Sequence, residues 1–256
     1  MTILATTPPE PAPVAVRGLI AGAWREAHRV WPTLWPLWLT SGMVTAAIEL
    51  TFRLLRPAGT PPGGVFTERL ANVTLSAAGL GTIAALALPV LLRHRETIGR
   101  LGPELAAYVR GYVLLTVGMT LADEGLASVL PTPLPLLVIP LGLAILFVAN
   151  LALAPWVLWN VSQLPGAGRL TVADAWRIGP GGAWAYAVAF CAVASVPVLA
   201  CWVLKAMFEH SGDLITLALA CGVGVLVTMW DTAVAAVFFR QRLGLERPET
   251  LADVFD

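Results

Sequence analysis

Six long apolar stretches, separated by short segments that carry arginine, constrain the fold of this chain most. They cover Thr33–Leu55, Ala71–Leu92, Leu105–Ala122, Leu134–Trp159, Ala183–Leu204 and Leu214–Phe239. Each is close to or above the ~20 residues that cross a bilayer core at ~1.5 Å per residue. Lipid offers the backbone no hydrogen bonds, so such segments must be helices. The sequence therefore predicts an all-α fold, a polytopic membrane bundle of six transmembrane helices.

The composition agrees with a membrane protein. Of the 256 residues 57% are apolar and 12% are charged, and the mean hydropathy is +0.77. About a quarter of a soluble domain is charged. We expect residues 1–16, rich in Pro and Thr, to form a disordered tail that is not a signal peptide. Residues 17–243 would form the six-helix domain, and residues 244–256 a cytoplasmic tail.

The positions of the basic residues predict the orientation. Of fifteen arginines and one lysine, eleven fall on one side of the predicted membrane, four on the other, and Arg110 within a span. The larger group is Arg17, Arg25, Arg29, Arg93, Arg95, Arg100, Arg169, Arg177, Arg240, Arg242 and Arg247. Short loops rich in Lys and Arg stay in the cytoplasm. We therefore expect a multi-pass protein of the bacterial cytoplasmic (inner) membrane with both termini inside the cell, as an even number of spans requires.

Short amphipathic helices are expected on the cytoplasmic face. Residues Arg17–Val30 carry apolar side chains at helical spacing with arginines between them, which is typical of an interfacial helix. Thr171-Val-Ala-Asp174 has the pattern of a capping box, which would start a second short helix. Gly179-Pro-Gly-Gly182 is expected to break the chain before the next span.

Tryptophans gather near the predicted cytoplasmic interface. Those expected to act as interfacial anchors are Trp24, Trp31, Trp35, Trp156, Trp159 and Trp176. Indole rings favour the boundary between lipid headgroups and acyl chains. A ligand site built from the same rings is the alternative.

Small residues recur at helical spacing within two predicted spans. Gly81 lies between Ala77 and Ala85, and Gly222 and Gly224 each follow an alanine by four residues. Such faces let helix backbones approach closely. They would serve packing within the bundle or an interface with another membrane subunit.

The charged residues within predicted spans include Arg110 and Asp231. Arg110 and Asp231 have estimated depths of ~8 and ~13 Å from the cytoplasmic end, at 1.5 Å per residue. An ion pair between them would neutralise both charges and join the third and sixth spans. The alternatives are an arginine that reaches the headgroups with an aspartate facing water, or a proton or substrate relay.

A second group of charges is predicted at the outer surface. It consists of Glu49, Arg53, Arg56, Asp123 and Glu124. Glu49 and Arg53 are four residues apart in the order that favours pairing on a helix. Paired surface charges are one interpretation, and an ion or headgroup site is the other.

Reaction motifs are missing from the sequence. It has no H-E-x-x-H, P-loop, nucleophile elbow or dinucleotide fingerprint, and no basic tract typical of nucleic-acid binding. Its three cysteines lie in apolar runs and its three histidines in separate segments, so no metal spacing arises. We therefore predict no catalytic residue, cofactor or metal, and no nucleic-acid partner.

From the fourth span onward the chain resembles a group of uncharacterised bacterial six-helix membrane proteins. The resemblance lies in Leu137-Val-Ile-Pro-Leu-Gly142, Leu153-Ala-Pro-Trp156 and Asp174-Ala-Trp-Arg177. The group is similar to the membrane domain of some glycerophosphodiester phosphodiesterases and to YciC-like proteins. The resemblance implies a fold and a location. It implies no catalytic residues, because the phosphodiesterase activity of such proteins belongs to a separate soluble domain.

These observations favour a non-enzymatic role. We expect an accessory, assembly or scaffold subunit that contacts the lipid bilayer and other membrane subunits through its small-residue faces. A permease subunit for a small solute or lipid, which a separate ATPase could drive, is the alternative. A membrane-embedded lipid-modifying enzyme is the third hypothesis.

Overall fold

The computed structural model describes residues 13–55, 66–92, 102–129, 135–164, 169–192 and 213–245, and every regular element among them is an α-helix. The helices are α1 (Val16–Leu55), α2 (Phe66–Leu91), α3 (Pro103–Val129), α4 (Pro135–Ser162), α5 (Val172–Ile178) and α7 (Asp213–Arg242). A further helix is described over residues 180–192. The all-α prediction is confirmed.

Two segments of these helices are long and apolar enough to cross a membrane. They are Leu70–Leu91 in α2 and Cys221–Arg242 in α7, with mean hydropathies of 1.8 and 1.7. The described part of α4 adds a shorter apolar helix, Phe147–Ser162. The described residues thus do not confirm the predicted number of six spans.

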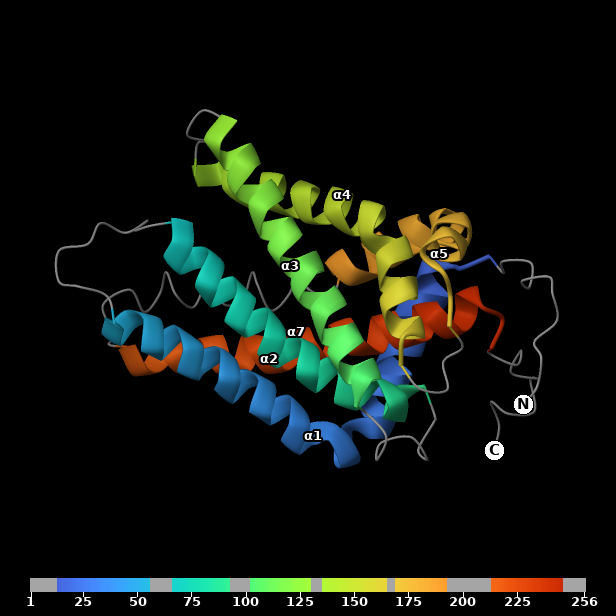
Figure 1. Ribbon diagram of the computed structural model, residues 1–256, viewed down its shortest axis with the longest axis horizontal. Coiled ribbons are helices and arrows are strands. Elements are labelled where there is room, and N and C mark those ends of the chain that lie inside the picture. Colours follow the sequence, from blue (N-terminus) through green and yellow to red (C-terminus); the bar gives the residue numbers. More distant parts are fainter. Residues whose placement is uncertain are drawn as a thin grey trace.

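The first helix differs from its prediction. Residues 16–55 form one helix of 40 residues, so the predicted interfacial helix and the first span are continuous. Its interior holds Pro32 and Pro36, which lack the backbone N–H that would complete the hydrogen-bond ladder. Figure 1 shows α1 changing direction along its length, as prolines within a helix favour.

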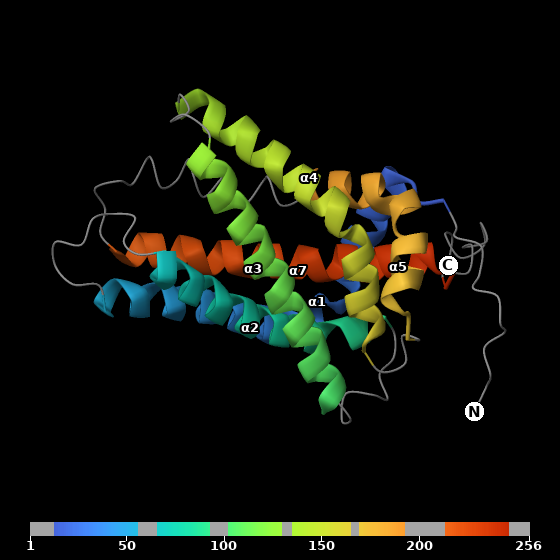
Figure 2. The same ribbon diagram turned by 45° about the horizontal axis from the view of Figure 1, so that its top comes forward.

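The helices pack around α7. In both views α1, α2 and α7 run alongside one another, and α3 and α4 lean away from them (Figures 1 and 2). The pair of α1 and α7 is the most extensive, and α7 also contacts α2 and α4. The largest fully buried side chains include Trp38, Tyr186, Phe238 and Phe239.

One end of the bundle collects the polar contacts that position the site. There α1 begins, α2 and α4 end, and α7 ends beside α5 (Figure 1). The last turn of α7 holds Arg240 and Arg242, and Gly244, whose φ of 63° suits glycine, follows the helix end. The N–H groups of Gly244 and Leu245 bond back to Gln241 and Arg240, which closes the helix end. We call this region the arginine end.

Candidate functional site

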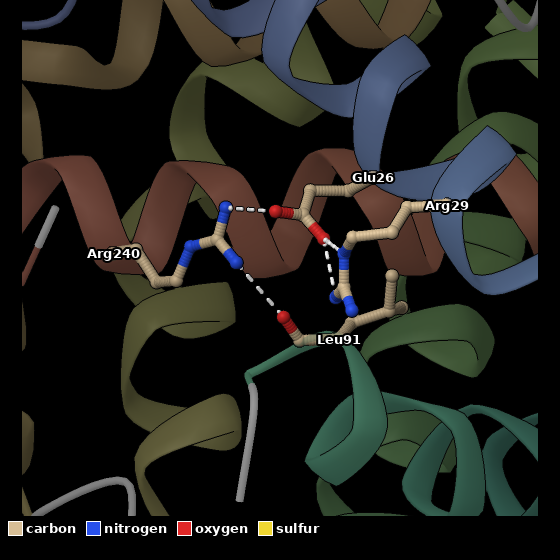
Figure 3. Close-up of polar contacts among 4 residues, drawn as sticks. All are labelled: Glu26, Arg29, Leu91 and Arg240. Carbon is tan, nitrogen blue, oxygen red and sulfur yellow. Dashed lines mark hydrogen bonds and ion pairs between the residues drawn. The ribbon is translucent and has the colours of Figure 1, made fainter. Parts of the chain in front are cut away.

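A buried carboxylate, Glu26, organises the arginine end. Its Oε1 accepts a hydrogen bond from Arg240 Nη2 at 3.0 Å, and its Oε2 accepts one from Arg29 Nε at 2.7 Å (Figure 3). The side chains of Glu26 and Arg240 are only 7% and 10% exposed. In so apolar a setting a charge pair persists only when both groups are well hydrogen-bonded.

The position of Glu26 follows from the helical repeat. Leu19, Ala23, Ala27 and Val30 are buried on the same face of α1, and Glu26 falls among them. That face packs on α7: a Cβ placed on Gly22 would lie 2.9 Å from Val237 Cγ1. Glu26 was not among the site residues predicted from the sequence. The sequence feature that could have identified it is a carboxylate on the apolar face of a predicted helix.

The two arginines of the last turn of α7 each reach the carbonyl end of another helix. Arg240 Nη1 donates to the carbonyl of Leu91, the last residue of α2, at 2.9 Å (Figure 3). Arg242 Nε donates to the carbonyl of Ile178, the last residue of α5, at 2.8 Å. The final carbonyls of a helix have no partner within it, and a guanidinium satisfies them. These bonds fix where α2 and α5 end against α7.

Glycines let the helix over residues 180–192 approach this end. A Cβ on Gly182 would lie 2.8 Å from Phe238 Cε2, and one on Gly181 would meet the guanidinium of Arg242. Gly179 has helical dihedrals and is the single residue that separates α5 from the next helix. At the predicted Gly-Pro-Gly-Gly break, a single residue therefore separates two helices.

The predicted capping box is confirmed. Thr171 Oγ1 accepts from the backbone N–H of Asp174 at 3.1 Å, and the Asp174 carboxylate accepts from the Thr171 N–H and hydroxyl. The hydrogen bond from the Thr171 side chain lowers the pKa of Asp174, and the backbone bond from Thr171 adds to the effect. Nearby, Arg169 pairs with Glu104 of α3 at 3.4 Å. These exposed contacts fix the start of α5.

The predicted ion pair between Arg110 and Asp231 is not among the contacts of the described residues. Asp231 Oδ2 instead accepts a hydrogen bond from Tyr112 Oη at 3.3 Å, whereas Arg110 is exposed. Residues 110 and 112 point ~200° apart around a helix, so they face opposite ways. The depth estimated for Arg110 did not give the direction of its side chain.

The three predicted packing glycines have different surroundings. A Cβ on Gly224 would lie 2.8 Å from Thr45 Oγ1 and 3.3 Å from Gly42 Cα, so α7 and α1 cross closely there. A Cβ on Gly81 would lie 3.0 Å from the Tyr112 ring. Gly222 is exposed and has nothing within 4 Å. Packing within the bundle thus accounts for Gly81 and Gly224 and leaves Gly222 on an open face.

Most of the predicted tryptophan anchors lie at the surface. Trp24, Trp31, Trp35 and Trp176 are exposed, as is Trp184. Trp156 and Trp159 are half-buried, and Trp156 Nε1 donates to the carbonyl of Gly111 at 3.2 Å. Those two rings therefore contribute to the contact of α4 with α3.

The predicted outer charge cluster lies outside the part of the chain whose side chains are described. Glu49, Arg53, Asp123 and Glu124 fall within α1 and α3, but their side chains are not described, and Arg56 is outside the described residues. Helix α3 continues to Val129, past the predicted end of the third span at Ala122.

The described residues contain no group of three or more His, Cys, Asp or Glu side chains that could hold a metal ion.

Two sites thus emerge with different chemistry. The Glu26 cluster joins α1, α2 and α7 through charge-assisted hydrogen bonds, which suits a structural clamp. Asp231 and Tyr112 place an acidic group and a hydroxyl between α7 and α3, which suits proton or cation exchange.

Comparison of the chain with protein-family models, curated proteins and solved structures gives no match.

Proposed function

We propose that this chain is an integral protein of the bacterial inner membrane and acts as an accessory or assembly subunit of a membrane complex. The apolar segments of α2 and α7 support a membrane location. So does the exterior, where exposed tryptophans such as Trp24 and Trp176 suit the interface between headgroups and acyl chains.

The orientation is proposed from the charges. Arginines of α1, α5 and α7 gather at the arginine end, and loops rich in Arg remain on the cytoplasmic side. The arginine end would then face the cytoplasm, with both termini inside the cell.

Cysteine labelling in intact cells tests location and orientation. In a background with Cys191, Cys201 and Cys221 replaced by alanine, Thr51→Cys lies on the far part of α1 and Val172→Cys at the arginine end; both positions are exposed. A membrane-impermeant maleimide should label Thr51→Cys directly and Val172→Cys only after permeabilisation. Equal labelling of both positions in intact cells would contradict the proposal.

The observation that carries the accessory role is the open face of α7. Ala218, Gly222 and Leu226 follow one another at intervals of four residues, and all are exposed. Two residues away, Gly224 is buried against α1. Within a membrane, small residues on an outward face allow another helix to approach closely. Small residues would thus allow α7 to pack on α1 on one side and on a partner subunit on the other.

Leucine substitutions separate these two roles. Gly222→Leu should leave the fold intact and abolish co-purification of the partner subunits in mild detergent. Gly118→Leu is the matched control, because Gly118 is also exposed on a helix with nothing within 4 Å. Gly224→Leu should destabilise the chain itself. Unchanged assembly of the Gly222→Leu protein would reject this face as the interface.

A permease subunit is the second candidate, favoured by the contact of Asp231 with Tyr112. A carboxylate inside a membrane domain is expensive and often marks a pathway for protons or ions. Proteoliposomes that contain the chain alone would then carry out solute flux that Asp231→Asn abolishes. Flux of this kind would replace the accessory role by a transport role.

A further inference from the structure

Asp231 has no charged partner among the described side chains, and it points between helices. Trp230, the preceding residue on α7, stacks on Trp24 of α1 with ring centroids 5.2 Å apart. Successive residues of a helix point ~100° apart, so Asp231 is turned away from that contact. Tyr112 of α3 donates to its Oδ2 at 3.3 Å, and the Tyr112 ring lies 3.0 Å from where a Cβ on Gly81 of α2 would be. The carboxylate therefore faces α2 and α3.

Neutral aromatic side chains lie around this carboxylate. The rings of Tyr108 and Tyr112 stack on α3 with centroids 6.2 Å apart. Tyr186, on the helix over residues 180–192, is 2% exposed, and both Tyr186 and Tyr108 lie within electrostatic range of Asp231. Asp231 and Tyr112 are themselves only half-buried, so water can still reach them. The carboxylate thus lies among phenol rings and not among cations.

In this setting the ionised form of Asp231 lacks a counter-charge. Burying a charge without a partner of opposite sign is expensive, so such a group is neutralised by a proton or by a bound cation. Glu26 differs because two guanidinium groups bind its carboxylate. Oδ1 of Asp231 makes no hydrogen bond to any described residue, which leaves this oxygen able to take up a proton.

The oxygen atoms near Asp231 favour a proton over a metal cation. Mg²⁺ and Ca²⁺ take about six to eight oxygen ligands, and potassium channels use free backbone carbonyls. Helix α7 runs unbroken through Asp231, so its carbonyls there are engaged in helical hydrogen bonds. The hydroxyls of Thr228 and Thr232 also donate to carbonyls within α7. Among the described residues, one carboxylate and the Tyr112 hydroxyl are too few ligands for such an ion.

We propose that Asp231 binds and releases a proton, with Tyr112 as the hydrogen-bond partner of both forms. The proton adds to Oδ1 of the carboxylate and gives a neutral acid, whose Oδ2 still accepts from the Tyr112 hydroxyl. Release returns the proton to water and restores the carboxylate. This proposal rests on the membrane location proposed above and names the ion for the transport candidate: solute movement through the chain would be coupled to protons and not to metal cations.

Infrared difference spectroscopy tests protonation directly. The full chain would be reconstituted in phosphatidylcholine liposomes, and its spectrum recorded as the pH falls from about 9 to about 5, where exposed carboxyl groups stay largely ionised. We expect the carbonyl stretching band of a protonated carboxyl group to appear, and to be absent from the Asp231→Asn protein. Asp174→Asn, which removes an exposed carboxylate, is the matched control and should keep the band.

Two tyrosine variants test the hydrogen bond. Tyr112→Phe removes the hydroxyl that donates to Asp231 and should shift the frequency of the band. Tyr108→Phe keeps the stacked ring and removes a hydroxyl that makes no hydrogen bond to Asp231, so the frequency should stay the same. An unshifted band in the Tyr112→Phe protein would reject Tyr112 as the partner. Both variants keep the carboxylate, so this test does not depend on the folding of the Asp231→Asn protein.

Competition distinguishes a proton from a metal cation. The titration would be repeated with sodium or potassium ions in place of N-methylglucamine, at constant ionic strength. We expect the same midpoint of the band in all three. A midpoint that moves to lower pH with sodium or potassium would show that the metal cation competes for Asp231, and would overturn the proposal.

The remaining outcomes separate this proposal from the proposed function. A chain that does not insert into liposomes contradicts the membrane location itself. A chain that inserts but shows no band that depends on Asp231 overturns the proton site alone. A band that is present at every pH would show that the proton is never released, and overturns the site in the same way.

Discussion

Glu26 and Asp231 lie in two regions that hold a carboxylate by different means. Glu26, at the arginine end, accepts hydrogen bonds from two guanidinium groups of α1 and α7. Asp231, more than two turns before Arg240 on α7, accepts one from the neutral hydroxyl of Tyr112. A charge with a charged partner and a charge with a neutral partner respond differently to neutralisation. The comparison suggests that Glu26 serves stability and that Asp231 is available for function.

The largest effect is expected from Glu26→Gln. The substitution keeps the shape of the side chain but removes the carboxylate charge that pairs with the buried guanidinium of Arg240. Breaking a buried ion pair on one side costs about 3–5 kcal/mol. We expect a loss of that size in the free energy of unfolding, measured by titration from mild detergent into sodium dodecyl sulfate.

Three variants sharpen this prediction. Glu104→Gln breaks the pair with Arg169, which is 77% exposed, and should cost less than ~1 kcal/mol. Arg29→Gln removes a partner from the same helix that is 40% exposed, and should cost a similarly small amount. Glu26→Gln combined with Arg240→Gln should recover part of the loss. Additive effects of the two would show that the residues are not coupled.

A smaller effect is expected at Asp231. Asp231→Asn keeps an oxygen that accepts from Tyr112 and removes the cost of a buried charge, so the free energy of unfolding should change by less than ~1 kcal/mol. Tyr112→Phe keeps the charge and removes its donor, and should cost about 1.5–3 kcal/mol. The same denaturant titration compares them. A greater loss from Asp231→Asn would point to a charged partner, and Arg110→Gln in the same background would identify it.

Local features of the sequence were predicted well because their causes are local. The capping box needs only Thr171 and Asp174 at the right spacing, and the structure contains it. The helical nature of the apolar runs likewise follows from backbone chemistry. The number of spans depends on where each helix meets the bilayer, and the described helices confirm two segments suitable for crossing.

Contacts between distant helices could not be derived in the same way. Depth along a helix placed Arg110 and Asp231 within ~5 Å of each other in height. The direction of each side chain depends on how α3, which packs on α2 and α4, is rotated relative to α7. Glu26 was not predicted because the apolar face of its helix was expected to lie at the membrane interface. In the structure that face packs on α7, so the carboxylate of Glu26 meets Arg240.

The smallest effect is expected at Asp174, an exposed carboxylate that is held chiefly by Thr171 and also lies 3.5 Å from the guanidinium of Arg177. The hydrogen bond from the Thr171 side chain lowers the pKa of Asp174 below its ordinary value of 3.8. A carboxylate with a lowered folded-state pKa stabilises the fold above the unfolded-state pKa and loses this effect as the pH falls through the folded-state value. We therefore expect the start of α5 to fray below about pH 3.8, without global unfolding at that step. Amide hydrogen exchange at Asp174 would report this fraying, and Thr171→Ala should raise the pKa of Asp174 towards its ordinary value. A pKa of Asp174 that does not respond to Thr171→Ala would show that the capping box is not its cause.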